Sequence, residues 1–436
     1  MEKAVKAGNS VGNQPVFISK GRRDTETSVA APCRRGGAVR WFLALLVSLV
    51  STTASALPFT FEARSLGMGG VAVATADLAT AAWANSAMLT RQSEQFRDEE
   101  FAVLVGLGAF LRDDDDLVSD IENFQDADDD RKDARDAGDL AELARAIAEM
   151  RLIVRGIESK IIAPEASFLF SAGRVKDDYA FAISVRTDII AGGTVTDLSC
   201  ELIEPGCDPS ELLSDDFNIL NLEGVQATEY GFSIARDYTL YDRRVSIGVK
   251  PKLVDLRAFT FRESILTVNA GYESIDDKDQ RLDLGSFFTI DLGLAADVYD
   301  YWVVGLNFRN LIPADFDING QILDFDTEAA LGIAYNHPLF TVALDYDLNE
   351  NEPFLANRNF DALTTQFIAL GAEIRPTRFA SLRVGVAKNI VDGISSDARE
   401  PQYTIGLGLW IGFNLDIAVI ANDNSLGAVL QTGFRF

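Results

Sequence analysis

The chain has 436 residues and a formal net charge of −27 at pH 7. An excess of carboxylates of this size repels phosphate backbones, so we expect no nucleic acid among the partners. The longest apolar run, 41–50, is shorter than the roughly 20 residues of a membrane helix, so a chain embedded in lipid would have to form a closed β-barrel.

The N-terminal region has the order of a secretory signal peptide. Arg34, Arg35 and Arg40 precede the apolar run, and the small residues Ala-Ser-Ala at 54–56 follow it. This order predicts export, with residues 1–56 forming a leader that is cleaved and takes no part in the fold. A short membrane anchor or a buried helix is the alternative interpretation of the run.

Small residues crowd the next segment, 57–99, which we call the hatch. Gly67, Gly69 and Gly70 lie within four residues of one another. Glycine lets backbones approach closely, so this segment is suited to packing inside another structure. A phosphate-binding loop is the alternative interpretation of these glycines, but no strand precedes them and no Lys follows at the required spacing.

From residue 100 onward, segments of about ten residues alternate between apolar and small or polar positions, as barrel strands do. In 179–187, for example, Tyr179, Phe181 and Ile183 alternate with alanine and serine. The pattern predicts an antiparallel outer-membrane β-barrel of about 14 strands over 100–436. The predicted strands are 100–111, 163–174, 178–193, 223–237, 244–262, 284–298, 302–313, 326–335, 339–349, 363–375, 379–390, 401–411, 414–421 and 426–436.

The links between these strands are alternately short and long. In outer-membrane barrels the short turns face the periplasm and the long loops face outward. This alternation of short and long links, which we call the parity of the links, predicts an even number of strands with both chain termini of the barrel in the periplasm. The short links are 175–177, 238–243, 299–301, 336–338, 376–378 and 412–413.

The longest link holds an acidic insertion, 113–160, which parity places outside the cell. It begins with four consecutive aspartates, and its second half, 140–150, is rich in strong helix formers. The sequence predicts a solvated helical loop packed on the barrel rim. A docking surface for a partner is the alternative.

Two of the three cysteines fall in the mature part of the chain, at Cys200 and Cys207. A close pair in an exported chain predicts a disulfide that closes a small loop, with free thiols as the alternative. The spacing differs from the Cys-x-x-Cys of thiol oxidoreductases.

One loop has the ligand spacing of a calcium site. Asp315, Asp317, Asn319 and Asp326 match the positions of an EF-hand loop, with Asp in place of its final Glu. An acidic hairpin supplies the same oxygen atoms without binding an ion. Calcium is the one cofactor that the sequence suggests.

Enzyme activity is not expected. The single histidine, His337, precedes a proline in a predicted periplasmic turn, far from the outer rim. No general base is therefore available near the acidic loops for a Ser-His or Asp-His mechanism.

The chain ends on an aromatic residue, Phe436, with Phe434 and Leu430 on the same face of the last predicted strand. The C-terminal strands of outer-membrane barrels look like this. The barrel-assembly machinery, which recognises such a terminal aromatic, is therefore an expected partner, together with membrane lipid.

The hatch resembles the N-terminal segment of the FadL-like outer-membrane proteins. In this sequence the residues that match the shared pattern are Ala63 to Asp77 and Asn85 to Leu89, with Ser86 in place of a proline. The whole mature chain is similar to the conjugal transfer TraF-like proteins, which join this hatch to a charged helical insertion and a barrel. The resemblance implies an outer-membrane location, a plug in the lumen, and passage of hydrophobic molecules.

The same resemblance implies that Arg64 and Asp77 form a polar latch that holds the plug. We therefore expect a plugged channel that binds a hydrophobic or amphipathic ligand on its outer side. A structural or accessory component of a conjugation or secretion apparatus is the rival interpretation. An open aqueous porin is disfavoured because the plug would block it.

Overall fold

The computed structural model describes residues 54–55, 62–91, 100–113, 116–157, 160–199, 213–268, 280–318, 321–352, 364–392, 399–423 and 425–436. The chain divides into two compact units, 1–50 and 51–436, and all of the described residues belong to the second. The predicted leader boundary and the cysteines Cys200 and Cys207 lie outside these residues.

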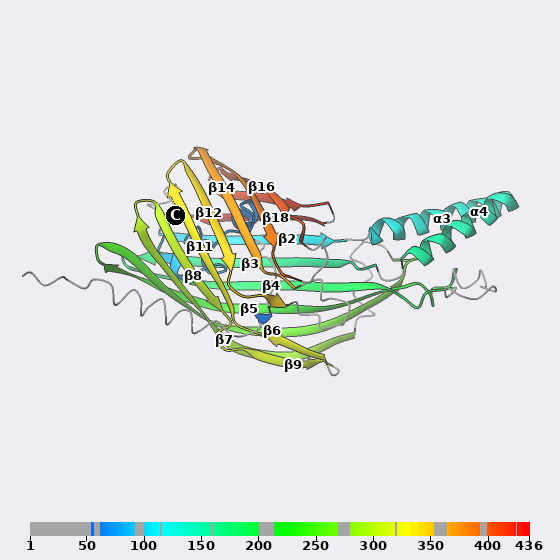
Figure 1. Cartoon of the computed structure of the whole chain (residues 1–436), viewed down its shortest axis with the longest axis horizontal. Helices are drawn as coiled ribbons and strands as arrows, with labels where there is room; N and C mark the ends of the chain where they lie inside the picture. The colour runs from blue at the N-terminus through cyan, green and yellow to red at the C-terminus, as the bar shows by residue number, and fades with distance from the viewer. Residues whose placement is uncertain are drawn as a thin grey trace, which may run out of the picture. The chain divides into compact units, whose positions relative to one another are not determined.

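Fourteen antiparallel strands close into a barrel, which confirms the predicted fold (Figure 1). In chain order they are β2 (Phe101–Arg112), β3 (Ala163–Lys176), β4 (Tyr179–Thr196), β5 (Ile219–Leu240), β6 (Arg243–Ser264), β7 (Gln280–Tyr299), β8 (Trp302–Arg309), β11 (Glu328–His337), β12 (Phe340–Asp347), β14 (Phe367–Thr377), β15 (Ala380–Asn389), β16 (Gln402–Trp410), β17 (Asn414–Ala421) and β18 (Ser425–Arg435). The last strand, β18, pairs with the first, β2, so the sheet has no free edge.

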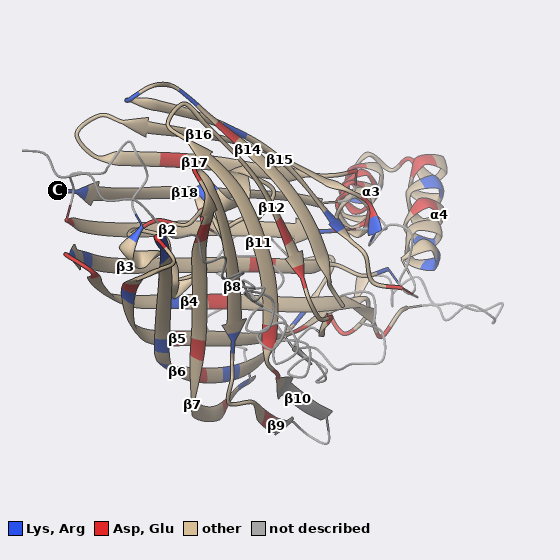
Figure 2. Cartoon of the chain, turned by 60° about the vertical axis from the view of Figure 1, so that its left-hand side comes forward, with Lys and Arg blue, Asp and Glu red and all other residues tan. Residues whose placement is uncertain are grey.

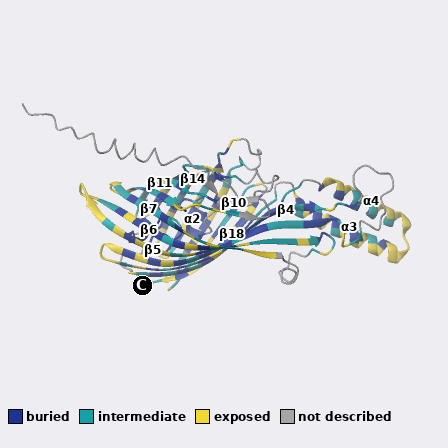
Figure 3. Cartoon of the chain, turned by 90° about the horizontal axis from the view of Figure 1, so that it is seen from below, coloured by how far each residue is buried: buried dark blue, intermediate teal, exposed yellow. Residues whose placement is uncertain are grey.

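The two faces of each strand differ as the sequence pattern predicts, and Figure 3 shows buried and exposed positions alternating along the strands. On β18 the outward side chains include Leu426, Leu430 and Phe434, each more than half exposed. The buried positions between them, such as Val429 and Gln431, face the lumen. Outward apolar and inward small or polar residues are the signature of a barrel in lipid, and the chain is an outer-membrane β-barrel.

The links alternate in length as predicted. At one end the strands are joined by tight turns at 177–178, 241–242, 300–301, 338–339, 378–379 and 411–413. Asp177, Tyr241, Asp242 and Tyr301 in these turns have positive φ, as tight hairpin turns require. We call this the periplasmic end, following the rule for short turns, and the opposite one the outer end.

Exposed aromatic side chains gather at the periplasmic end, where an interfacial girdle is expected. They include Tyr179, Tyr241, Tyr299, Phe379 and Phe436.

The acidic insertion forms a helical hairpin at the outer end, α3 (Leu117–Ala137) and α4 (Leu140–Gly156) (Figure 1). Figure 2 shows how densely charged residues cover these helices. The prediction for 140–150 is confirmed, but α3 extends the helical structure into the aspartate-rich half. Asp113 accepts hydrogen bonds from the N–H groups of Leu117 and Val118, at 2.6 and 2.9 Å, and so caps α3.

Smaller pairings complete the outer end. The segment predicted to bind calcium is a hairpin of β9 (Ala314–Ile318) and β10 (Gln321–Phe325), and β1 (Ala54–Ser55) lies parallel to β13 (Asn351–Glu352). Phe316 and Phe325 of the hairpin pack on Phe287 of β7. None of the helices in the described residues is long and apolar enough to span a bilayer.

The outward face predicts how the barrel responds to a charge. Replacing Val384, which is 56% exposed in the middle of β15, by Arg should destabilise the folded barrel by about 2–4 kcal/mol. Phe379→Arg, in the turn before β15, is the control and should cost about 0–1 kcal/mol because it lies at the interface. Reversible unfolding in phospholipid bilayers measures both. Equal costs would contradict a lipid-facing position for Val384.

Candidate functional site

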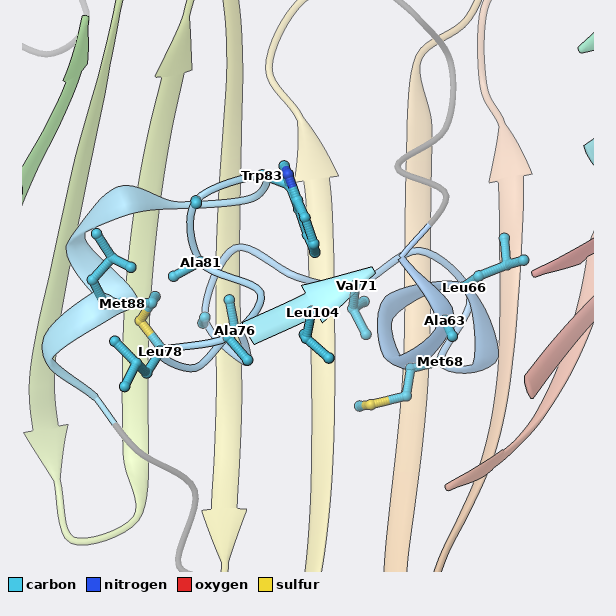
Figure 4. Packing of buried hydrophobic residues seen from close by; sticks show 14 of the residues in the cluster. Ala63, Leu66, Met68, Val71, Ala76, Leu78, Ala81, Trp83, Met88 and Leu104 are labelled. Carbon is cyan, nitrogen blue, oxygen red and sulfur yellow. The ribbon is translucent and has the colours of Figure 1, made fainter. Parts of the chain in front are cut away.

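The described part of the hatch, 62–91, fills the barrel lumen. Its short helices α2 (Ala63–Gly67) and η1 (Ser86–Thr90) are buried along their whole length. Leu66, Met68 and Val71 pack in one apolar cluster with the inward side chains Leu104 of β2 and Val429 of β18 (Figure 4). The lumen is therefore a packed core at this level.

Polar side chains begin both hatch helices. The Glu62 carboxylate accepts hydrogen bonds from the N–H groups of Arg64 and Ser65, at 2.9 and 2.8 Å. Asn85 caps η1 by accepting from the N–H of Ala87 at 3.1 Å. Burial raises the pKa of the Glu62 carboxyl, although its two N–H donors counteract part of that rise.

The backbone of the hatch lies directly on barrel strands because glycines face it. A Cβ added at Gly371 of β14 would lie 2.1 Å from the carbonyl oxygen of Met68, and one at Gly385 of β15 would lie 2.2 Å from the nitrogen of Gly69. On β8, three strands from β14 around the barrel, a Cβ at Gly305 would lie 2.5 Å from the carbonyl oxygen of Val73. Only glycine permits so close an approach of two backbones.

The predicted hatch glycines meet this surface from the inside. Gly67 packs on Gly406 of β16, where an added Cβ would lie 3.0 Å from the facing Cα. Gly69 has a φ of +77° and touches the backbone of Val386, while Gly70 has a φ of +94° and faces open space. Glycine is therefore required at position 69 for both the positive φ and the close packing, and at position 70 for the positive φ alone.

Arg64 ties the hatch to the barrel through a buried charge cluster. Its Nε lies 3.0 Å from the Glu373 carboxylate of β14, which also pairs with Arg375 and, at 2.8 Å, with Arg383 of β15. Arg383 reaches on to Asp416 of β17 at 2.6 Å. Each charge in this cluster has an opposite partner, as buried charges require.

Asp77 makes a separate attachment. Its Oδ2 accepts from the Arg435 guanidinium of β18 at 2.9 Å, and its Oδ1 accepts from the N–H of Ala79 at 3.1 Å. Burial alone would raise the pKa of Asp77, but the charges of Arg435 and Arg64 outweigh it and lower that pKa. Arg64 and Asp77 therefore each pair with a barrel strand, and no hydrogen bond or ion pair between the two is present.

Other hatch attachments use backbone groups. The Asp345 Oδ2 atom of β12 accepts from the N–H groups of Ala72 and Val73, at 2.7 and 2.8 Å. Asn85 donates from Nδ2 to the carbonyl oxygens of Val73 and of Leu294 in β7, at 2.8 and 3.1 Å. The predicted residue Asn85 thus both caps η1 and joins the hatch to the barrel.

The C-terminal end of the hatch is also held. The Thr90 hydroxyl donates to Asp237 of β5 at 2.6 Å and lies 3.4 Å from the hydroxyl of Ser246 in β6. Arg91 pairs with Asp297 of β7.

The hatch separates two hollows of different character. A cavity of about 810 Å³ lies between the hatch and the periplasmic turns, and we call it the periplasmic cavity. Its lining is largely charged and includes Arg64, Asp77, Arg91, Asp242 and Asp300. A smaller one of about 120 Å³, the outer pocket, lies against the opposite side of the hatch and is bounded by the outer ends of β8, β11, β12 and β14. The two linings share no residue.

The remaining predicted sites take no part in this arrangement. Asp315 and Asp326 lie in or beside the β9–β10 hairpin, whereas Asn319 is outside the described residues, and the described part of the chain contains no group of three or more potential metal-ligating side chains. Phe436 packs on Phe101 with a ring-centre distance of 5.0 Å. His337 lies in an aromatic group with Tyr335 and Phe340 at the periplasmic end.

The close packing of the hatch can be tested at Gly371. Gly371→Ala should displace the hatch, because its Cβ would overlap the Met68 carbonyl, at a cost of about 1–3 kcal/mol. Gly106→Ala is the matched control, since its Cβ would find ordinary contacts at 3.7 Å. Trypsin cleavage at Arg64 and Arg91 reports hatch displacement. Equal cleavage of the two variants would contradict the backbone contact.

The Asp77–Arg435 pair predicts a pH dependence. Asp77→Asn removes the carboxylate charge that faces the buried Arg435 guanidinium and should loosen the hatch by about 3–5 kcal/mol at pH 7. Because the folded pKa of Asp77 lies below its usual 3.8, the pair stabilises fully above about pH 3.8 and this stabilisation is lost as the pH falls through the folded value. The leak conductance of planar bilayers should therefore differ between variant and wild type at pH 7 and converge below that range.

Glu100→Gln is the control for this experiment, since the Glu100–Arg174 pair is solvent-exposed and worth about 0–1 kcal/mol. A difference between Asp77→Asn and wild type that persists unchanged in acid would contradict the pairing.

The described barrel resembles solved outer-membrane channels in fold. A mutant of the TodX monoaromatic hydrocarbon channel matches with a TM-score of 0.51 and 13% identity, over 87% of this chain and 100% of the other. The P. putida toluene transporter TodX matches with a TM-score of 0.50 and 11% identity, over 87% of this chain and 99% of the other. At such identities the likeness shows the fold alone.

No curated protein matches the sequence. Residues 82–347 match the family described as F plasmid transfer operon, TraF, protein. The match confirms the predicted resemblance to TraF-like proteins. The matched region is more than half of the 436 residues, and the chain therefore belongs to the TraF family.

Proposed function

We propose that this protein is a plugged outer-membrane channel that passes small hydrophobic molecules. The observation that carries the proposal is the hatch, which closes the lumen between an outer pocket and a periplasmic cavity. The fold of the TodX hydrocarbon channels supports it. In this function a ligand enters the outer pocket, and movement of the hatch gives it access to the periplasmic cavity.

The proposal assigns roles to the predicted site residues. Gly67, Gly69 and Gly70 let the hatch backbone fit the barrel wall, Asn85 fixes its second helix, and Arg64 and Asp77 act as two separate latches. The division into a leader (1–56), hatch (57–99) and barrel (100–436) belongs to the same proposal. So do the Cys200–Cys207 disulfide and a weak calcium site at Asp315, Asp317, Asn319 and Asp326.

The partners follow from the same function. Membrane lipid surrounds the barrel, and a hydrophobic small molecule is the ligand. We further propose that the barrel-assembly machinery recognises Phe436, that nucleic acid is not a partner, and that the protein is not an enzyme. The position of His337 among aromatic side chains at the periplasmic end supports the last point.

A disulfide lock tests whether transport requires hatch movement. The Thr90 and Ser246 hydroxyl oxygens are 3.4 Å apart, so Thr90→Cys with Ser246→Cys can join hatch to barrel. In a background with Cys200 and Cys207 replaced by serine, the oxidised protein should lose uptake of labelled toluene into proteoliposomes, and a reductant should restore it.

The matched control joins two barrel strands and leaves the hatch free. Thr187→Cys with Thr228→Cys uses hydroxyl oxygens that are 3.1 Å apart on β4 and β5, and it should transport toluene in both redox states. Full transport by the oxidised hatch lock would contradict the proposed movement.

A second function follows from the family match to a transfer-operon protein. The barrel would then anchor an accessory component of a conjugation or secretion apparatus, with α3 and α4 as its docking element. Unchanged toluene uptake on deletion of the gene, together with reduced DNA transfer between cells, would favour this function over the channel.

A further inference from the structure

The outer pocket has an aromatic and small-residue wall. Trp83 of the hatch and Phe367 of β14 contribute rings, and Ala330, Ala369 and Ala387 contribute small side chains. An apolar cavity of about 150 Å³ accommodates benzene, so the 120 Å³ of this pocket suits the ring or head of one small molecule.

The charges around this wall are mainly negative. Glu328, Asp345 and Asp347 line the pocket, and the single cation in its lining is Arg309. The Arg309 guanidinium is already shared between two carboxylates, Glu328 at 3.2 Å and Glu229 at 3.3 Å. Among the described residues no Lys or Arg lies within ion-pair distance of Asp345 or Asp347, so an anionic ligand would meet a lining with more negative than positive groups.

The lining also holds buried polar atoms that find no partner in the described part of the chain. They are the indole Nε1–H of Trp83, which is 3% exposed, and the acceptor oxygens Asp345 Oδ1 and Asn351 Oδ1. Trp83 lies at one edge of the apolar cluster (Figure 4). Buried donors and acceptors are normally paired, because an unmet group loses its hydrogen bonds to water without replacement.

We propose that the outer pocket binds small neutral aromatic molecules carrying a hydroxyl group in preference to the corresponding carboxylates. A hydroxyl both donates and accepts, so it can use the Trp83 N–H and a carboxylate or amide oxygen of the lining. The ring occupies the wall formed by Trp83, Phe367 and the alanines. A carboxylate head would lose its hydration and face Asp345 and Asp347.

This inference rests on the proposed channel function, because a binding pocket in the lumen serves transport. Ligand binding can nevertheless be measured separately from transport. Calorimetric titration of the detergent-solubilised protein at pH 8 with p-cresol, toluene and benzoate compares three ligands that share one ring. We expect p-cresol to bind at least about tenfold more tightly than toluene, and benzoate to show no binding in the same concentration range.

Trp83→Phe removes the N–H and keeps an aromatic ring. It should reduce the preference for p-cresol over toluene by about tenfold and leave toluene binding within about twofold. Trp302→Phe is the matched control, because Trp302 is 40% exposed on the lipid-facing side of β8, and it should change neither affinity. Asp347→Asn should narrow the difference between p-cresol and benzoate by removing one repelling charge.

Equal binding of p-cresol and toluene would show that the polar lining atoms serve only water, and benzoate binding as tight as p-cresol would contradict the charge argument. Either result overturns the inference. If p-cresol binds with the expected preference but the protein with the locked hatch still transports toluene, the inferred binding site is supported and the proposed movement of the hatch is contradicted.

Discussion

The fold depends on one constraint, that every backbone N–H and C=O facing hydrocarbon must be paired within the protein. The register between β18 and β2 meets it by joining the ends of the sheet, from Ser425 opposite Arg112 to Arg435 opposite Ala102. Once the sheet is closed, the alternation of side chains sends one set into lipid and the other into the lumen. The lumen must then be filled, and the hatch fills it.

The fit between hatch and barrel combines close contact of backbones, apolar packing and a few buried charge pairs. Glycines on facing strands remove the side chains that would keep the hatch at a distance, and Asp345 holds two of its N–H groups. The buried cluster around Glu373 and the Asp77–Arg435 pair add polar attachments to the apolar packing of the hatch. The proposed channel requires these contacts to break while the barrel around the hatch stays folded.

The sequence pattern predicted the barrel well because period two and turn length are local properties of the chain. The predicted helical insertion is confirmed, although the aspartates of its first half lower helix propensity. Asp113 caps α3, and Phe124 lies in the apolar cluster that also contains Met150 of α4. The hatch residues Arg64 and Asp77 were predicted, but their partners were not. Glu373 and Arg383 lie opposite each other on neighbouring strands. The alternating pattern predicts that both side chains face the lumen, but it cannot predict that Arg64, about 300 residues earlier in the chain, contacts Glu373.

The central claim is that the hatch is a folded, separately movable element inside a closed barrel. Hydrogen–deuterium exchange of the full chain in lipid bilayers, with and without toluene, tests it most directly. The account predicts slow exchange in β2 to β18 under both conditions, and hatch amides at 62–91 that are protected alone but exchange faster with ligand. Hatch amides that exchange like an unfolded peptide without ligand, or strands that exchange as fast as the hatch, would contradict it.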